Sequence, residues 1–365
     1  MLIYIVNFLL NMAMGWFLLF FRRSTDPQAG YDQNKRKKVY LFLTTLQLGL
    51  LCGFRSTQMT YDIAAYETIF LQAPNTWRTI FKNTQYVEIG FSVLCSLIKL
   101  LGGDFQTLLI LSSLFVTGSC CLFIYRHSNN VLLSVFIIIS FPFYYSSFDI
   151  LRHFIAISFL LLSYKYMVEK RFVWYATLLV IGSLFHTITL LFIPFYFLRY
   201  IKFNALIFLA SGAVLVVVFI YMNEIASILS ALMGKTDYGD SDWVGSYGGG
   251  IKTAVMYVGV FILSLLSFYQ LREKKMEDHL SIFFVLFLTF CSILFIQARM
   301  LTRMIMTMIP FLAIAIPRLF DKKNTHDLQI RNFVFVLFLI IGCVYHGFML
   351  LTSWQNVVPY IPYWK

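Results

Sequence analysis

Charged residues are scarce in this chain. Only 13% of the 365 residues are Asp, Glu, Lys or Arg, whereas 59% are hydrophobic and the mean hydropathy is +0.76. Soluble domains carry about 25% charged residues and roughly 45–50% apolar ones. The composition therefore excludes a soluble globular protein and predicts a membrane protein.

No segment alternates apolar and polar residues as a membrane barrel strand does. The apolar runs are repeatedly ~17–22 residues long, which is the length that a helix needs to cross the hydrocarbon core. A helix also satisfies its own backbone hydrogen bonds in lipid. We predict an all-α polytopic bundle with about ten full spans, forming a single integral membrane domain over residues 1–365.

Motifs for disulfides, metals and nucleotides are missing. The six cysteines lie within apolar segments and none belongs to a C-x-x-C motif. This pattern indicates neither a zinc site nor a disulfide framework. A P-loop, a G-x-S-x-G motif and a haem motif are also absent, so nothing in the chain supports coupling to ATP. We predict no cofactor and no metal ligand, while dependence on a divalent metal stays open.

Acidic residues are outnumbered, with 17 Asp and Glu against 29 Lys and Arg. Most of the basic residues lie in short loops between apolar runs, where they act as topology signals rather than as a nucleic-acid surface. The basic linker 22–38 is therefore expected in the cytoplasm, with both termini external. Because Arg22 and Arg23 follow the first apolar run instead of preceding it, we predict an uncleaved first helix.

Three further segments shape the predicted topology. Residues 55–104 and 223–250 are predicted external loops. Within the first loop, residues 88–101 are too short to span and are predicted to form a juxtamembrane helix on the outer interface. The apolar run 172–198 has basic residues at both ends, so it is expected to double back as a re-entrant or broken helical hairpin with His186 at its tip.

Four arginines contradict the positive-inside pattern, since Arg55, Arg152, Arg299 and Arg303 fall at predicted outer ends of spans. A guanidinium stays charged and binds phosphate oxygens through two parallel hydrogen bonds. Together these arginines predict a site for a diphosphate group. The alternative is that each arginine pairs with a nearby carboxylate or reaches toward water.

In that alternative, Arg55 would pair with Asp62 and Arg152 with Asp149. Asp62 and Glu88 are also candidate catalytic groups, because a carboxylate near a partly desolvated face can take a proton from a hydroxyl. Asp62 is equally suited to cap the helix that follows it.

His186 is the third catalytic candidate, as an acid, a base or a sugar hydrogen-bond donor, because of its expected place at the tip of the hairpin. A lone histidine on an apolar face is otherwise a core residue. Tyr66, His153 and Trp243 are predicted to contact the glycan, since aromatic rings stack on sugars, although such rings also serve as ordinary interface anchors.

Several motifs resemble the EpsG family of polysaccharide-synthesis membrane proteins, which is grouped with Wzy-type polymerases. The matching residues are Gly53-Phe54-Arg55 followed by Asp62 and Tyr66, Glu88-x-Gly90-Phe91, Leu151-Arg152-His153-x-x-Ala156, and Phe185-His186 before Pro194. The chain departs from the family at two places. It has Thr60-Tyr61-Asp62 where the family has Gly-x-Asp, and Arg152-His153 where the family has Arg-Gln.

The resemblance implies a glycosyltransferase that joins polyprenyl-diphosphate-linked oligosaccharide repeat units at the outer face of a bacterial plasma membrane. It also implies a loose likeness to the GT-C plan, and a lipid-linked donor, a flippase and chain-length regulators as partners. Two other classes stay open: a transporter or flippase of lipid-linked glycans, because broken helices build carrier sites, and a membrane O-acyltransferase.

Overall fold

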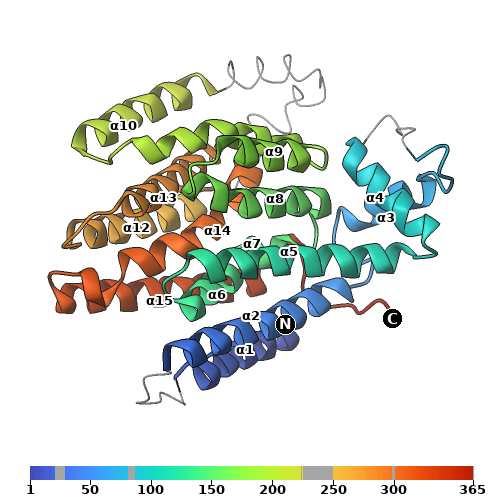
Figure 1. Ribbon diagram of the computed structural model, residues 1–365, viewed down its shortest axis with the longest axis horizontal. Helices are drawn as coiled ribbons and strands as arrows, with labels where there is room; N and C mark the ends of the chain where they lie inside the picture. Colours follow the sequence, from blue (N-terminus) through green and yellow to red (C-terminus); the bar gives the residue numbers. More distant parts are fainter. Residues whose placement is uncertain (21–28, 81–86, 223, 225–249, 298–300, 365) are drawn as a thin grey trace. The chain divides into compact units, whose positions relative to one another are not determined.

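A computed structural model describes the protein, and its described residues are 1–20, 29–80, 87–222, 224, 250–297 and 301–364. These parts of the chain are helices joined by turns, and the two β-bridges found among them are isolated pairs of residues outside any strand. The predicted all-α class is confirmed (Figure 1). The predicted loop 223–250 lies almost wholly outside the described residues.

Seven described helices are long and apolar enough to cross a membrane. They are α1 (Leu2–Phe20), α5 (Phe105–His127), α8 (Leu151–Val168), α12 (Gly250–Tyr269), α13 (Met276–Leu294), α14 (Thr302–Leu319) and α15 (Leu328–Leu351). The remaining larger apolar helices are shorter or begin with charged residues: α2 (Ala29–Gly53), α6 (Val131–Ser140), α9 (Phe172–Ser183) and α10 (Ala205–Ile220). The chain is a multi-pass helical protein, and the total of ten spans stays a prediction.

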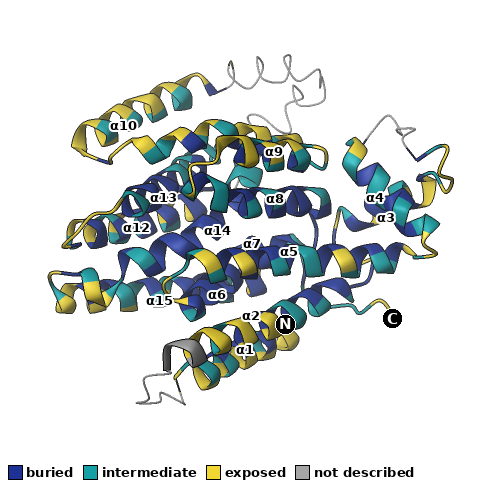
Figure 2. Cartoon of the chain, viewed as in Figure 1, coloured by how far each residue is buried: buried dark blue, intermediate teal, exposed yellow. Residues whose placement is uncertain are grey.

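Exposure differs strongly between the helices (Figure 2). Helix α14 is buried along most of its length, whereas α10 has no buried residue at all. An apolar helix without a buried face has its side chains available to lipid, since hydrocarbon solvates Leu and Val as well as a protein core does. This pattern fits a protein whose surface faces a bilayer.

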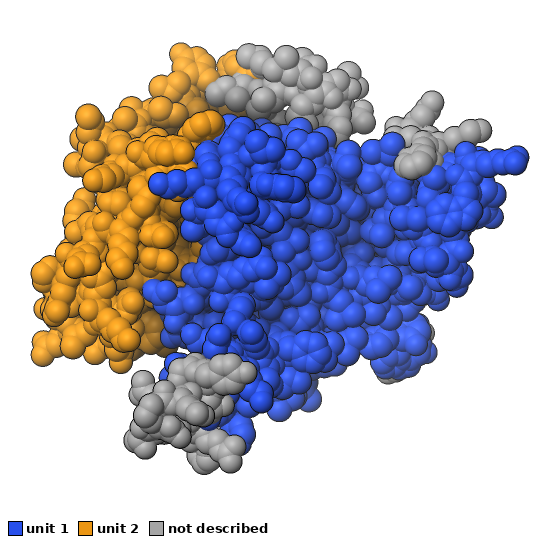
Figure 3. All heavy atoms as spheres, viewed as in Figure 1, with its two compact units in different colours: residues 1–196, 342–365 blue, residues 197–341 orange. Residues whose placement is uncertain are grey.

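The chain forms two compact units (Figure 3). Unit 1 contains residues 1–196 and 342–365, and unit 2 contains residues 197–341. In unit 2, helices α12, α13 and α14 pack against one another. The prediction of one membrane domain over 1–365 stays a prediction.

In unit 1, α2 packs between α1 and α5, α5 packs on α8, and α8 packs on α9. Small residues permit the close approach of α2 and α5, as they do between membrane helices generally. A Cβ atom added at Gly53 would lie 2.9 Å from the Cα atom of Ile110. The backbone of α5 therefore runs directly beside the end of α2.

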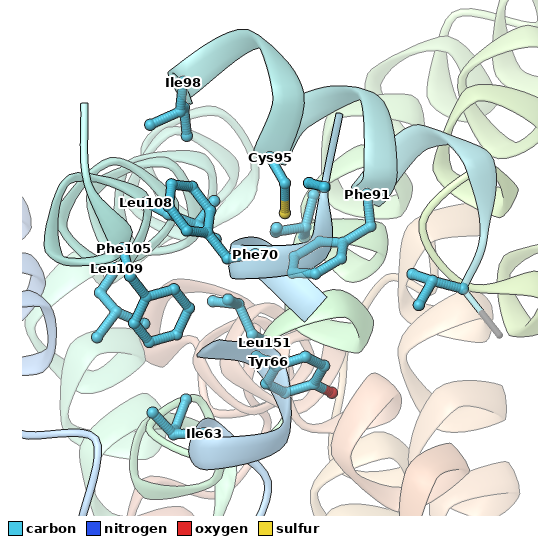
Figure 4. Packing of buried hydrophobic residues seen from close by; sticks show 13 residues of the cluster. Ile63, Tyr66, Phe70, Phe91, Cys95, Ile98, Phe105, Leu108, Leu109 and Leu151 are labelled. Atoms are coloured by element: carbon cyan, nitrogen blue, oxygen red, sulfur yellow. The ribbon is translucent and has the colours of Figure 1, made fainter. Parts of the chain in front are cut away.

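The two short helices of the first predicted loop, α3 (Ile63–Gln72) and α4 (Ile89–Leu100), are anchored by apolar packing. Figure 4 shows Tyr66 and Phe70 from α3 and Phe91 and Cys95 from α4 directed into one cluster with residues of α5 and α8. Phe91 is fully buried, and burial of such a ring contributes about 1.5–3 kcal/mol. The helix predicted at 88–101 is present, and this packing holds the segment before it against α8.

The run 172–198 doubles back as predicted. Helix α9 ends at Ser183, and the 3-10 helix η1 (Thr187–Tyr200) returns along it. The Tyr175 hydroxyl donates to the carbonyl of Phe192 at 2.6 Å, and the Thr189 hydroxyl donates to the carbonyl of Leu179 at 3.0 Å. The break between the two helices contains His186.

Candidate functional site

Arg152 and Glu88 form an ion pair between two elements that are distant in sequence. Arg152 lies in the first turn of α8, and Glu88 immediately precedes α4. Their side chains retain 24% and 17% of their exposure, so the pair is partly buried. Glu88, rather than the alternative Asp149, is therefore the carboxylate that pairs with Arg152.

Tyr66 completes the surroundings of this guanidinium. The ring of Tyr66 lies 5.5 Å from the Arg152 Cζ atom, in a cation–π arrangement, and its edge packs on Phe91 at 5.6 Å between ring centroids. An aromatic face stabilises a partly desolvated cation, most strongly where water is excluded. Tyr66 and Glu88 thus hold Arg152 at the beginning of α8, where the helix dipole also favours an anion.

Two histidines lie beside this pair. His153 follows Arg152 in α8 and is fully buried, whereas His186 in the α9–η1 break is half-buried. Their ring centroids are 4.9 Å apart at an interplanar angle of 77°. An imidazole can take or give a proton, and this contact places His186 against His153, the residue that follows Arg152.

The α9–η1 break is tied to the start of α4 by backbone contacts. The Gly90 N–H donates to the carbonyl of Leu184 at 2.8 Å, and a Cβ atom at position 90 would lie 2.7 Å from that oxygen. Only glycine permits this approach without a shift of the backbone. Gly90 therefore connects the segment that carries Glu88 with the one that carries His186.

Asp62 lies at the N-cap position of α3, where its side chain makes no capping hydrogen bond. Its backbone N–H instead donates to Asp149 Oδ1 at 2.7 Å, and Asp149 is 3% exposed. Asp149 thus fixes the start of α3 to the turn before α8. In the sequence, Asp149 was recognisable only as an acid before an apolar helix. Its partner, the backbone N–H of Asp62, could not be inferred.

Arg55 does not make its alternative ion pair with Asp62. It is fully buried at the end of α2, and Nη1 donates to the carbonyl of Cys52 and, at 3.3 Å, to Ser113 Oγ. Within the described residues, no carboxylate lies within ion-pair distance of Arg55, and no hydrogen bond or ion pair joins it to Arg152.

The structure does not test whether the other predicted site residues join this group. Arg303 lies in α14 of unit 2, while Arg299 and Trp243 lie outside the described residues. The shared site of four arginines therefore stays a prediction. Among the residues that the structure describes, no three His, Cys, Asp or Glu side chains are grouped in a way that could hold a metal ion.

These features define a multi-pass helical membrane protein in which a cation, a carboxylate and a histidine pair gather around the first turn of α8. The family model of the EpsG family matches residues 38–362, and the chain belongs to this family. Searches of curated proteins and of solved structures gave no match. The family is associated with glycosyltransferase-like polymerase activity in polysaccharide synthesis.

Proposed function

We propose that the protein is a glycosyltransferase that polymerises polyprenyl-diphosphate-linked oligosaccharide repeat units at the outer face of a bacterial plasma membrane. Family membership supports the polymerase class. The donor and the side of the membrane rest on the predicted topology and on the chemistry of the site. A flippase and a chain-length regulator are the proposed partner proteins.

The observation that carries the proposal is the placement of Arg152. Its guanidinium is held by Glu88 and by the face of Tyr66, and it keeps 24% of its side-chain exposure. It is thus fixed in position and still accessible to an anion. A positioned arginine binds two phosphate oxygens at once and neutralises charge that develops on a leaving diphosphate.

The proposed step is a substitution at the anomeric carbon of the donor sugar. A hydroxyl oxygen of the acceptor unit forms the new glycosidic bond, and the bond from the anomeric carbon to the diphosphate oxygen breaks. The diphosphate leaves with the electron pair and is stabilised by Arg152. The hydroxyl proton passes to His186, with Asp62 as the alternative base. The predicted contact of His153 and Tyr66 with the glycan gains no support from their positions, because both side chains are buried.

The test is Arg152→Ala, added back to a strain that lacks this chain, with the glycan sized on a gel. We expect chain lengthening to fall by about 100-fold or more, the usual effect of removing a group that stabilises developing charge. Single repeat units should accumulate on the carrier. Arg171→Ala is the matched control, because Arg171 is exposed beyond the other end of α8. Normal polymer in Arg152→Ala would refute the proposal.

A flippase is the second candidate, and the doubled-back α9–η1 segment is the observation that favours it. Broken helices build substrate sites in many carriers. The two functions differ in where lipid-linked units accumulate when the chain is deleted. Loss of a polymerase leaves single units on the outer leaflet, whereas loss of a flippase leaves them on the inner leaflet.

A further inference from the structure

The segment that follows α15 lies across the end of α2. This segment, residues 354–364, is called the tail strap below. The Trp354 Nε1–H donates to Ser146 Oγ at 3.0 Å, and the Tyr360 hydroxyl donates to the carbonyl of Leu51 at 2.9 Å. Both contacts lie within unit 1 and join the tail strap to its core.

Two backbone hydrogen bonds attach the tail strap on either side of Arg55. The Ser56 N–H donates to the carbonyl of Ile361 at 2.8 Å, and the Tyr363 N–H donates to the carbonyl of Phe54 at 2.9 Å. The rings of Phe54 and Tyr363 stack with centroids 5.7 Å apart. The strap therefore pairs with the backbone at the position that carries the Arg55 side chain.

Beneath this pairing, Arg55 is 0% exposed. Its Nε and Nη2 atoms have no hydrogen-bond partner among the described residues, and the ring of Phe148 lies 5.8 Å from Cζ. Burial raises the pKa of Tyr360 to about 12, so this neighbour stays neutral at pH 7 and supplies no counter-charge. The guanidinium is a buried cation with unused donors.

An unpaired buried cation is unfavourable, because its charge has lost water without gaining an opposite charge. The unused Nε and Nη2 donors point to a ligand that accepts two hydrogen bonds and carries negative charge. A phosphate group has this chemistry, and arginine binds it bidentately. Because Pro362 of the tail strap pairs with Arg55, movement of the strap would uncover this position for such a ligand.

The start of the tail strap, together with Ser353 just before it, has an unusual backbone. Ser353, Gln355 and Asn356 have φ angles of 50°, 56° and 56°, in the left-handed region that non-glycine residues rarely adopt. Strained backbone of this kind marks places where a segment is held by surrounding contacts and can change conformation. Residues 353–356 are thus suited to act as the hinge.

We propose that the tail strap covers an anion site at Arg55, which binds a phosphate group of the lipid-linked substrate after the strap opens. The inference rests on the proposed function for the identity of the substrate. It adds a second phosphate contact, apart from Arg152, and a moving segment that controls access to it.

The test is a reversible lock of the strap. Phe54→Cys and Tyr363→Cys are combined, because these residues face each other in the paired segment. Cys343→Ser is added to remove an exposed thiol, and Arg152→Ala removes the first phosphate contact. Binding of inorganic diphosphate to the purified protein is measured by calorimetry after oxidation and after reduction, with the single Phe54→Cys variant as control.

We expect the reduced protein to bind one diphosphate per chain, and oxidation to weaken this binding at least tenfold. Arg55→Gln should show the same loss without oxidation. Should the cysteine pair fail to fold, Tyr363→Ala serves instead, and it should bind diphosphate more tightly because the ring stack that holds the strap is lost. Equal affinity before and after oxidation, or unchanged affinity in Tyr363→Ala, overturns the proposal.

Two further binding measurements decide whether the phosphate belongs to the lipid carrier or to another source. A short polyprenyl diphosphate that binds at least tenfold more tightly than inorganic diphosphate supports the lipid carrier. Equal affinities, or displacement of diphosphate by nanodiscs containing phosphatidylglycerol, overturn that assignment. Strap-dependent binding together with normal lengthening in Arg152→Ala would refute the proposed function and leave the anion site. Binding that does not depend on the strap, together with lost lengthening in Arg152→Ala, would refute the strap proposal alone.

Discussion

At the scale of the residue, the ion pair of Glu88 and Arg152 is the most informative contact. A carboxylate that occupies a guanidinium competes with any phosphate that approaches it, because both accept the same N–H donors. Glu88 therefore has two opposing effects in the proposed reaction. It keeps Arg152 oriented in the free protein, and it must release donors when the diphosphate binds.

This competition predicts the behaviour of Glu88→Gln. The neutral amide holds Arg152 less strongly, so we expect inorganic diphosphate to bind about 3- to 10-fold more tightly, while chain lengthening slows because Arg152 is less well oriented. Calorimetry and glycan sizing measure the two effects separately.

Glu67→Gln is the control for this variant, since Glu67 is a half-buried acid on α3. Unchanged diphosphate affinity in Glu88→Gln would show that the carboxylate does not compete for Arg152.

At the scale of the element, the start of α4 and the α9–η1 break are in direct backbone contact. They are joined through Gly90 and Leu184, and α4 is in turn packed on α5 and α8 by the apolar cluster of Figure 4. A displacement at this contact would move Glu88 and His186 relative to Arg152. The geometry of the site thus depends on a backbone approach that carries no chemistry itself.

Gly90→Ala tests this dependence. The added methyl group would meet the Leu184 carbonyl oxygen at 2.7 Å, and overpacking of this kind costs about 1–3 kcal/mol. We expect a lower unfolding temperature in detergent and reduced chain lengthening.

Gly347→Ala in α15 is the matched control, because a Cβ atom there has no neighbour within 4 Å. Alanine also favours the helix there, so this variant should be at least as stable as the parent. Equal stability of the Gly90 and Gly347 variants would contradict the tight contact.

At the scale of the whole molecule, the proposed reaction requires the site to face outward. The ends of α2 and α9 and the start of α8 lie with α3 and α4 at one end of unit 1 (Figure 1). The loop after α8, which contains Lys170 and Arg171, lies at the other end of that helix. The positive-inside bias predicts that the latter end is cytoplasmic.

Cysteine labelling tests this orientation. Tyr61 is 72% exposed, so Tyr61→Cys should react with a membrane-impermeant maleimide added to intact cells. Arg171→Cys should react only after the membrane is opened, because its side chain, 58% exposed, lies at the opposite end of α8. Both variants carry Cys343→Ser. Labelling of Arg171→Cys alone in intact cells would invert the predicted topology and refute an outward-facing site.

Much of the fold could be predicted from local pattern. The apolar runs predicted the helices, the basic residues flanking 172–198 predicted its doubling back, and its break contains His186. The pairing of Arg152 was not predictable, since Glu88 lies 64 residues away and Asp149 only three. Proximity in sequence favoured Asp149, whose carboxylate instead accepts the Asp62 N–H.

The amino-acid sequence by itself determined the class of protein, because hydropathy and helix length depend only on the composition of each segment. It also showed which arginines depart from the positive-inside pattern. Only the tertiary structure decided which of them meet. Packing of α3 and α4 on α5 and α8 joins Glu88, Tyr66 and Arg152, and the returning tail strap pairs with the backbone on either side of Arg55. Contacts of this kind depend on three-dimensional packing between distant segments, and no local pattern encodes them.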